Sequence, residues 1–496
     1  MFTTVSPQPS LWEAILPEIA LRIPAQLASV DALLDDPVFI EPYRAHFDPV
    51  WGRPSIPIET YLRMMFLKHR YRLGYESLCR EVTDSISWSR FCRIPFGEAV
   101  PHPTTLMKIT TRCGEGVVKE LNDSLVRKAN DAKVLKLDKV RADTTVVEAN
   151  VSYPTDSGLL AKAIARIASL IIAIHAAGGA TRTRVRDRRR SAGRKARSIS
   201  AHLKLRGDDA RAAVKRITAE LADLAETAAG EAGAVVANAR RKVIREGMDP
   251  GCRLARLVGE LETLLGRTTR VVAQTRTRLS GVTPDGSTRL VSLHDPDARP
   301  IAKGRLGKPV EFGYKAQVVD NSQGIVVDYE VVTGNPPDAP MLPRAVARIT
   351  ALLGKTPRAA TADRIYGEKG MDEQLQGLGV KKVVIPRKGK PDAARRQAEH
   401  TRGFRALVKW RTGCEGRISQ LKHRCGWNRS LLDGLGGAQT WCGLGVLVHN
   451  AVRIAPLMEA KATPRPGTMA GSRATGRRPE HTGDPPPEQQ EPAKAY

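Results

Sequence analysis

Three carboxylates in this sequence stand in positions from which they could together hold divalent metal ions. Asp143 lies in a run of Val and Thr that is typical of a strand, where Asp is disfavoured. Asp363 stands where a second short strand is expected to stop, and Glu415 lies in a late basic helix. Oxygen ligands of this kind suit Mg²⁺ or Mn²⁺. Two such ions about 4 Å apart would support in-line phosphoryl transfer.

The net charge of the chain indicates a polyanionic partner for such a site. The 496 residues include 79 Lys and Arg against 52 Asp and Glu, which gives a formal charge of +27. A field of this sign favours nucleic acid before a membrane. Aromatic residues make up only 5%, which argues against binding of single strands mainly by stacking. The seven cysteines include no C-x-x-C pair, which argues against a disulfide framework or a zinc ribbon and for a reducing cytoplasm.

The stretch around Glu415, CEGRISQLKHRCGWNRS at 414–430, sets this acid among many bases. If one helix runs over 404–424, then Arg411, Glu415 and Lys422 fall within roughly 40° of one another at about 100° per residue. This face is expected to pack against a sheet with its polar groups at the rim. The basic side chains expected to contact nucleic-acid phosphates here are Arg411, Arg417 and Lys422. For each acid taken alone, ordinary pairing with a base at the surface is the commoner situation.

A second basic segment, RTRVRDRRRSAGRKAR at 182–197, contains three consecutive arginines, Arg188, Arg189 and Arg190. Together with the charge of the whole chain, its density of arginine favours phosphate contacts that do not depend on sequence. The alternative is a solvated and partly disordered basic loop.

The elements that would position these residues form an α/β order: a mixed sheet domain interrupted by a helical insertion and preceded by an all-α N-terminal domain. The N-terminal helices are compatible with a helix-turn-helix and equally with a plain bundle. The predicted divisions are helices over 1–130, the first part of the sheet domain over 131–156, a basic helical insertion over 157–285, the rest of the sheet domain over 286–458, and a disordered tail over 459–496.

The most apolar window, 159–180, is interrupted by Lys162, Arg166 and His175. Charges at these intervals favour an amphipathic or buried helix over a transmembrane span. The N-terminus lacks a basic region followed by an apolar core, so no secretory signal is expected. The sequence therefore predicts a cytoplasmic protein that does not reside in a membrane.

Four ordered motifs carry a resemblance to a known family. They are RADTTVVEANVSYPTDSGLL, HDPDARPIAKGRLGKPVEFGYK, TADRIYGEKG and RTGCEGRISQLKHRCGWNRSLLDG. With the helical block IPIETYLRMMFLKHRYRLGYESL, the chain up to about residue 455 resembles an insertion-sequence transposase of the DDE class, whose catalytic domain is ribonuclease-H-like. Any one of these motifs alone would be a weak signal.

The resemblance implies roles for individual residues. Asp143, Asp363 and Glu415 would be the first, second and third acids, which act as catalytic residues and metal ligands. Arg411 and Lys422 match the R-x3-E-x6-K part of a signature found in relatives, whereas Val408 stands in place of the tyrosine of that signature. The helical insertion would lie between the first two acids.

The resemblance also implies an activity, which is cleavage and joining of double-stranded DNA at transposon ends and at a target, with Mg²⁺ or Mn²⁺ as cofactor. A homodimer on DNA in the bacterial cytoplasm is expected. Two alternatives remain open from the sequence: a catalytically inactive nucleic-acid-binding protein, and a metal-dependent nuclease of the same fold that cuts without rejoining.

Overall fold

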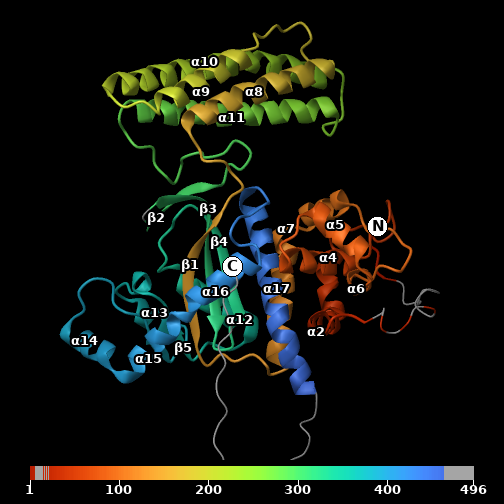
Figure 1. Ribbon diagram of the computed structural model, residues 1–496, viewed down its shortest axis with the longest axis vertical. Helices are drawn as coiled ribbons and strands as arrows, with labels where there is room; N and C mark the ends of the chain where they lie inside the picture. The colour runs from red at the N-terminus through yellow and green to blue at the C-terminus, as the bar shows by residue number, and fades with distance from the viewer. Residues whose placement is uncertain (6–14, 16, 18, 20–21, 306, 463–496) are drawn as a thin grey trace, which may run out of the picture.

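The computed structural model describes residues 1–5, 15, 17, 19, 22–305 and 307–462. A helical N-terminal region is followed by a mixed α/β sheet domain, and four long helices are inserted after the first strand of the sheet (Figure 1). This architecture agrees with the order of elements that the sequence predicts.

The sheet has six strands, and β1 lies near its centre in the order β2-β3-β1-β5-β6, with β4 also paired to β3. β1 runs antiparallel to β3 and parallel to β5, and β5 runs parallel to β6. An antiparallel half joined to a parallel half is consistent with a ribonuclease-H-like domain. The strands are β1 (Val140–Glu148), β2 (Arg299–Arg305), β3 (Lys308–Asn321), β4 (Val326–Thr333), β5 (Ala359–Thr361) and β6 (Lys382–Val384).

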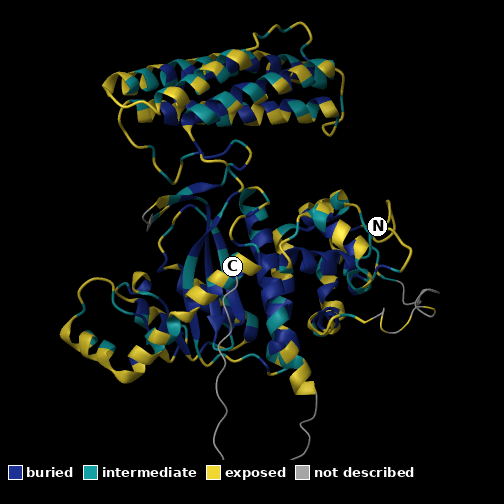
Figure 2. Ribbon diagram, viewed as in Figure 1, coloured by how far each residue is buried: buried dark blue, intermediate teal, exposed yellow. Residues whose placement is uncertain are grey.

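Side chains alternate between the two faces of β1. Val140 and Ala142 pack in one core cluster with helix α12 (Met341–Leu353), whereas Val147 packs in another cluster with Leu421 and Trp427. Both faces of the central strand are therefore buried, and dark blue marks this burial in Figure 2. The predicted hairpin at DNSQG is confirmed as the β3–β4 turn, in which Gly324 has a φ of 75° that favours glycine.

The N-terminal helices pack against the last helix of the described chain, α17 (Gly434–Ala462), which lies between them and the sheet (Figure 1). Leu444, Leu447 and Val448 of α17 share one core cluster with these helices. The N-terminal helices are α2 (Ala25–Leu34), η2 (Pro37–Phe39), α3 (Glu41–Arg44), α4 (Ile58–Arg70), α5 (Tyr75–Asp84), α6 (Ile86–Phe91) and α7 (Pro103–Asp131). Helix α17 continues to Ala462, so the predicted tail from 459 begins inside a helix, and residues 463–496 lie outside the described residues.

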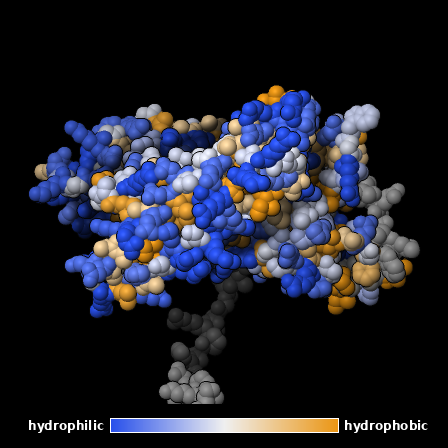
Figure 3. Space-filling view, turned by 90° about the horizontal axis from the view of Figure 1, so that it is seen from above, coloured by the Kyte–Doolittle hydropathy of each residue, from blue (hydrophilic) through white to orange (hydrophobic). Residues whose placement is uncertain are grey.

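The insertion is a bundle of α8 (Asp156–Ala176), α9 (Arg189–His202), α10 (Asp208–Arg245) and α11 (Arg253–Leu279). It stands at one end of the molecule, at the top of Figure 1, and the surface at that end is mostly hydrophilic with scattered apolar patches (Figure 3). Helix α8 buries one side in the bundle, as its interrupted apolar pattern predicts. By length and composition alone, α8 and α17 could each cross a membrane, but α17 is largely buried inside the protein.

The late basic helix differs from the prediction of a single helix over 404–424. It is divided at Thr412 into α15 (Arg402–Arg411) and α16 (Gly413–Arg424). Gly413 has a packing reason, since a Cβ there would lie 2.4 Å from Nη1 of Arg141. Between β5 and α15 the chain also forms η3 (Arg364–Tyr366), α13 (Met371–Gly377) and α14 (Ala393–His400).

Candidate active site

Asp143 and Asp363 come from neighbouring parallel strands. Val140 pairs with Ala360 and Arg141 with Thr361, so the same register continued by two residues sets Asp143 beside Asp363. Neighbouring strands lie about 4.8 Å apart. Asp363 itself follows β5 and caps η3, where its Oδ1 accepts a hydrogen bond from the Ile365 N–H at 2.9 Å. The carboxyl end of β5 thus meets the centre of β1, and this is where ligands gather in open sheets.

The carboxylate of Asp143 is mostly withdrawn from solvent, with 16% of its side chain exposed. Burial raises its pKa to about 6, and the carboxylates of Asp363 and Glu415 contribute to the rise. A hydrogen bond of 2.8 Å from the Thr144 N–H and the nearby Arg411 lower the pKa. A buried acid whose charge is opposed by two other acids is one that a cation would stabilise.

Glu415 lies in the first turn of α16, which packs against β1 and β3. Its side chain is 72% exposed and extends from the rim of this packed face. The guanidinium of Arg411 lies between the two acids, 3.6 Å from Oδ2 of Asp143 and 3.9 Å from Oε1 of Glu415. The structure therefore brings all three predicted acids into one electrostatic neighbourhood, with Arg411 as the adjacent base.

The donor chemistry of these residues fits Mg²⁺ or Mn²⁺, because all three are carboxylates and Asp143 is held at a raised pKa by its burial and its acidic neighbours. Among the described residues, no three side chains of His, Cys, Asp or Glu lie close enough together to enclose a metal ion. The exposed side chain of Glu415 is the part of the set with most freedom to close such a site.

Arg417, which the sequence predicts to contact nucleic acid, is engaged inside the protein in this structure. Its side chain is only 8% exposed, and its Nε lies 3.1 Å from Oδ2 of Asp320, which is fully buried. Arg141 binds the same carboxylate from β1, with Nε at 2.7 Å and Nη2 at 2.9 Å. One buried acid thus joins two buried guanidinium groups. A signal for Arg141 was present, because it lies two residues before Asp143 and so on the same face of β1.

The three arginines of the insertion have different surroundings. The structure places Arg188 in an ion pair with both carboxylate oxygens of Glu231, with 11% of its side chain exposed, so this residue is largely engaged within the bundle. Arg189 pairs with Asp187 at the surface, and Arg190 is exposed. The segment is not simply a loop, because its second half forms the start of α9.

Two further predicted positions lie on the same pair of late helices. Val408 of α15 is half-buried. The charged groups of Arg141 and Lys139 lie over the ring of nearby Trp410, at 4.5 and 4.7 Å from its centroid. Lys422 lies in the last turn of α16, where it lines a pocket together with residues of α4. No local pattern in the sequence indicates that Lys422 lines a pocket with residues of α4.

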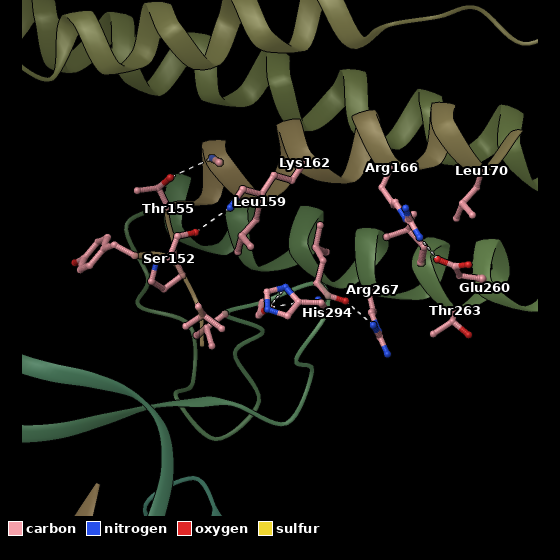
Figure 4. Close-up of a pocket in the computed structure, with 18 of the residues that line it drawn as sticks. Ser152, Thr155, Leu159, Lys162, Arg166, Leu170, Glu260, Thr263, Arg267 and His294 are labelled. Carbon is pink, nitrogen blue, oxygen red and sulfur yellow. Dashed lines mark hydrogen bonds and ion pairs between the residues drawn. The ribbon is translucent and has the colours of Figure 1, made fainter. Parts of the chain in front are cut away.

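A cavity of about 540 Å³ lies away from the three acids, where the linkers from the sheet enter α8 and α11 (Figure 4). Its basic side chains already have partners. Lys162 donates to Ser152 at 2.8 Å, Arg166 pairs with Glu260, and Arg267 donates to the Leu293 carbonyl.

Two parts of the chain match family models of transposase domains. Residues 280–451 match the Transposase DDE domain, and residues 18–112 match the Transposase domain (DUF772). The first range contains Asp363 and Glu415, whereas Asp143 lies before it. No solved structure matches the chain significantly.

A curated relative, the uncharacterized protein ORF8 in the nfe locus of Rhizobium meliloti, is 30% identical over 131 residues. That alignment covers 25% of this chain and 63% of the relative, so the chain spans less than two thirds of the relative's length. The two matched domains, in the order in which the helical region and the sheet domain occur, are both transposase domains. The chain belongs to the insertion-sequence transposases of the DDE class.

Proposed function

We propose that this protein cleaves and joins double-stranded DNA at the ends of an insertion sequence by divalent-metal-dependent phosphoryl transfer, with a ribonuclease-H-like catalytic domain. The observation that carries the proposal is that Asp143 on β1 lies beside Asp363 at the end of β5 and near Glu415 on α16, so that both of these carboxylates raise the pKa of Asp143. The match of residues 280–451 to a transposase DDE domain supports it.

Asp143, Asp363 and Glu415 would hold Mg²⁺ or Mn²⁺. When bound, the metal would activate a water or a 3′-hydroxyl and stabilise the leaving oxygen. Strand β1 fixes Asp143, the cap of η3 fixes Asp363, and the exposed Glu415 would close on the site from α16. Arg411 neutralises part of the negative charge of this cluster and is within reach of a phosphate beside it. Lys422 would hold the same strand further along α16.

The test uses Asp143→Asn, Asp363→Asn and Glu415→Gln, which keep side-chain shape while removing ligand charge. Each should abolish cleavage and joining of a duplex that carries the gene's own flanks. DNA binding should remain unchanged or improve slightly. The matched control is Asp138→Asn, an exposed acid just before β1 whose partner is Ser322. It should cleave like the wild type. Near wild-type cleavage by any one of the three acid variants would remove that residue from the site.

Metal dependence gives a readout that does not require turnover. Mg²⁺ or Mn²⁺ should raise the melting temperature of the wild type but not that of Asp143→Asn, because a ligand that binds only the folded state stabilises it. Strand-transfer products separate a transposase from a nuclease that cuts without rejoining. Binding without any metal-dependent cleavage would favour an inactive DNA-binding protein.

A further inference from the structure

A pocket of about 200 Å³ lies between the N-terminal helices and the catalytic helix α16. It is formed by the end of α4, the turn before α5, the end of α16 and part of α17. The residues that line it are Lys68, His69, Arg72, Leu73, Gly74, Lys422, Gly426, Asn428, Arg429, Leu431 and Trp441. This lining contains four Lys and Arg side chains and no Asp or Glu, and one of these bases, Arg429, pairs with Glu148 outside the lining at 3.8 Å.

Two of the lining side chains are buried without the partners that such groups require. Lys68 is 2% exposed, and its ammonium lies over the rings of Trp441 and Tyr75, at 4.3 and 4.6 Å from their centroids, rather than against a carboxylate. His69 is also 2% exposed. Neither of its ring nitrogens makes a hydrogen bond of acceptable geometry, although the Cys425 backbone is close enough to affect its pKa.

Burying polar groups in this state costs free energy that a bound anion would recover. Burial lowers the pKa of His69 well below its usual range, so the ring is neutral and retains one N–H donor. Lys68 supplies a charged donor beside it, and Arg72 and Lys422 add positive charge to the lining.

The backbone around Arg72 adds two features. Arg72 has a φ of 59°, a left-handed conformation that a glycine would adopt without strain, and its Nη1 donates to the His423 carbonyl at 3.3 Å. This arginine is therefore held in the turn that joins α4 to α5 and reaches the end of α16. Gly74 then caps α5 without a side-chain hydrogen bond, so the N–H groups of the first turn of α5 begin at the pocket wall.

We propose that this pocket binds a backbone phosphate of the DNA strand that is cleaved, and that it thereby joins the N-terminal helices to the helix that carries Glu415. The inference rests on the proposed DNA transposase function and adds a second phosphate site to it. The pocket volume of about 200 Å³ is several times the roughly 30 Å³ that one water molecule takes in the liquid, so the pocket has room for a phosphate group.

The position of the pocket along α16 predicts which phosphate it holds. Lys422 follows Glu415 by two turns on the same face, a rise of about 10 Å at 1.5 Å per residue. Phosphates of one strand advance by about 3.4 Å per nucleotide along the duplex axis. For a strand that runs alongside α16, the phosphate in the pocket should lie roughly three nucleotides from the one that is cleaved.

The experiment uses full-length protein and duplexes that contain the gene's flanking sequence, each with one neutral methylphosphonate linkage, and measures binding in Ca²⁺, which is expected not to support cleavage. Wild-type protein should lose several-fold in affinity at one linkage about two to four nucleotides from the cleavage position, the window that the geometry sets. Arg72→Gly should lose a similar factor on unmodified DNA and show no further loss at that linkage, because the same interaction is already absent.

Arg72→Gly is chosen because it removes the guanidinium and also relieves the positive φ, so the variant should fold at least as well as the wild type. Arg429→Ala gives a second removal of charge from the pocket lining. Arg80→Ala, an exposed arginine on α5 outside the lining, is the matched control and should keep the sensitivity to the linkage.

Inorganic phosphate distinguishes the source of the anion. Phosphate should stabilise the wild type against thermal unfolding more than chloride does at equal ionic strength, and this gain should disappear in Arg72→Gly. The proposal is overturned if phosphate stabilises the wild type but no methylphosphonate linkage loses its effect in Arg72→Gly, because the pocket would then bind a free anion and not a DNA phosphate. The proposal is also overturned if the loss of DNA affinity caused by Arg72→Gly adds to the loss caused by each methylphosphonate linkage. If the wild type fails to bind its flanking DNA at all, the proposed function fails first.

Discussion

The guanidinium of Arg411 lies 3.6 Å from the carboxylate of Asp143, at a site where that carboxylate is opposed by two other acids. The base belongs to α15, and the acid to the central strand of the sheet. Arg411 therefore offsets part of the negative charge of the candidate metal site.

Replacing Arg411 by Ala should slow single-turnover cleavage at saturating DNA by about tenfold or more, while the dissociation constant for DNA changes by no more than about threefold, because the interaction acts at the reacting phosphate. Arg411→Lys should recover part of the rate, since it restores charge without the planar fork. Arg405→Ala, on the same helix and exposed, is the control. Equal losses in affinity and in rate would assign Arg411 to DNA binding alone.

Asp320 should prove structural. Asp320→Asn leaves the guanidinium groups of Arg141 and Arg417 buried without their counter-charge, which should lower the free energy of unfolding by about 3–5 kcal/mol. Denaturant titration measures this loss. Asp138→Asn, which changes an exposed acid just before β1, should alter stability by less than about 0.5 kcal/mol. A fully stable Asp320→Asn variant that has lost cleavage would instead place Asp320 among the catalytic residues.

The exposed arginines of the insertion should contribute sequence-independent DNA binding. Neutralising Arg182, Arg184 and Arg190 together should weaken binding to all duplexes and reduce the slope of log affinity against log salt by about 0.9 for each DNA phosphate that the variant no longer neutralises. Arg188→Ala should leave the slope nearly unchanged, since Glu231 already pairs with that side chain. A slope that stays constant in the triple variant would show these arginines to be solvated surface charge.

Lys68 predicts a pH dependence of stability. Burial lowers its pKa to about 8, below the ordinary value of about 10.4, so the charged form is penalised in the folded protein. The penalty is complete below about pH 8 and disappears as the pH rises toward about 10. Relative to Lys68→Met, the wild type should therefore gain on the order of 2 kcal/mol in unfolding free energy between about pH 7.5 and about pH 10.

This measurement is a difference between two proteins, so groups common to both cancel. The groups that face Lys68 are His69, Tyr75, Arg72, Lys422 and Arg429, and all remain in the variant. Saturating phosphate should reduce the pH-dependent gain, because an anion in the pocket favours the charged ammonium. A difference that is the same at both pH values would mean that Lys68 keeps its ordinary pKa.

The sequence alone determined much of this protein. The run of Val and Thr around Asp143, the turn at Gly324 and the three- and four-residue apolar steps of the insertion are local patterns, and each local pattern specifies its own strand, turn or helix. The motifs around Asp363 and Glu415 also identified the family, which the domain matches confirm.

Only the tertiary structure decided what the basic side chains do. Arg411, Arg417 and Lys422 stand on neighbouring helices with similar surroundings in sequence, yet one lies beside Asp143, one is buried against Asp320, and one lines a pocket with Lys68 of α4. The interruption at Thr412 likewise separates two helices that periodicity joins. Helical spacing determines which residues share a face, but the partner of a charge depends on which distant element packs there, and that packing is set by burial of the whole core rather than by any local pattern.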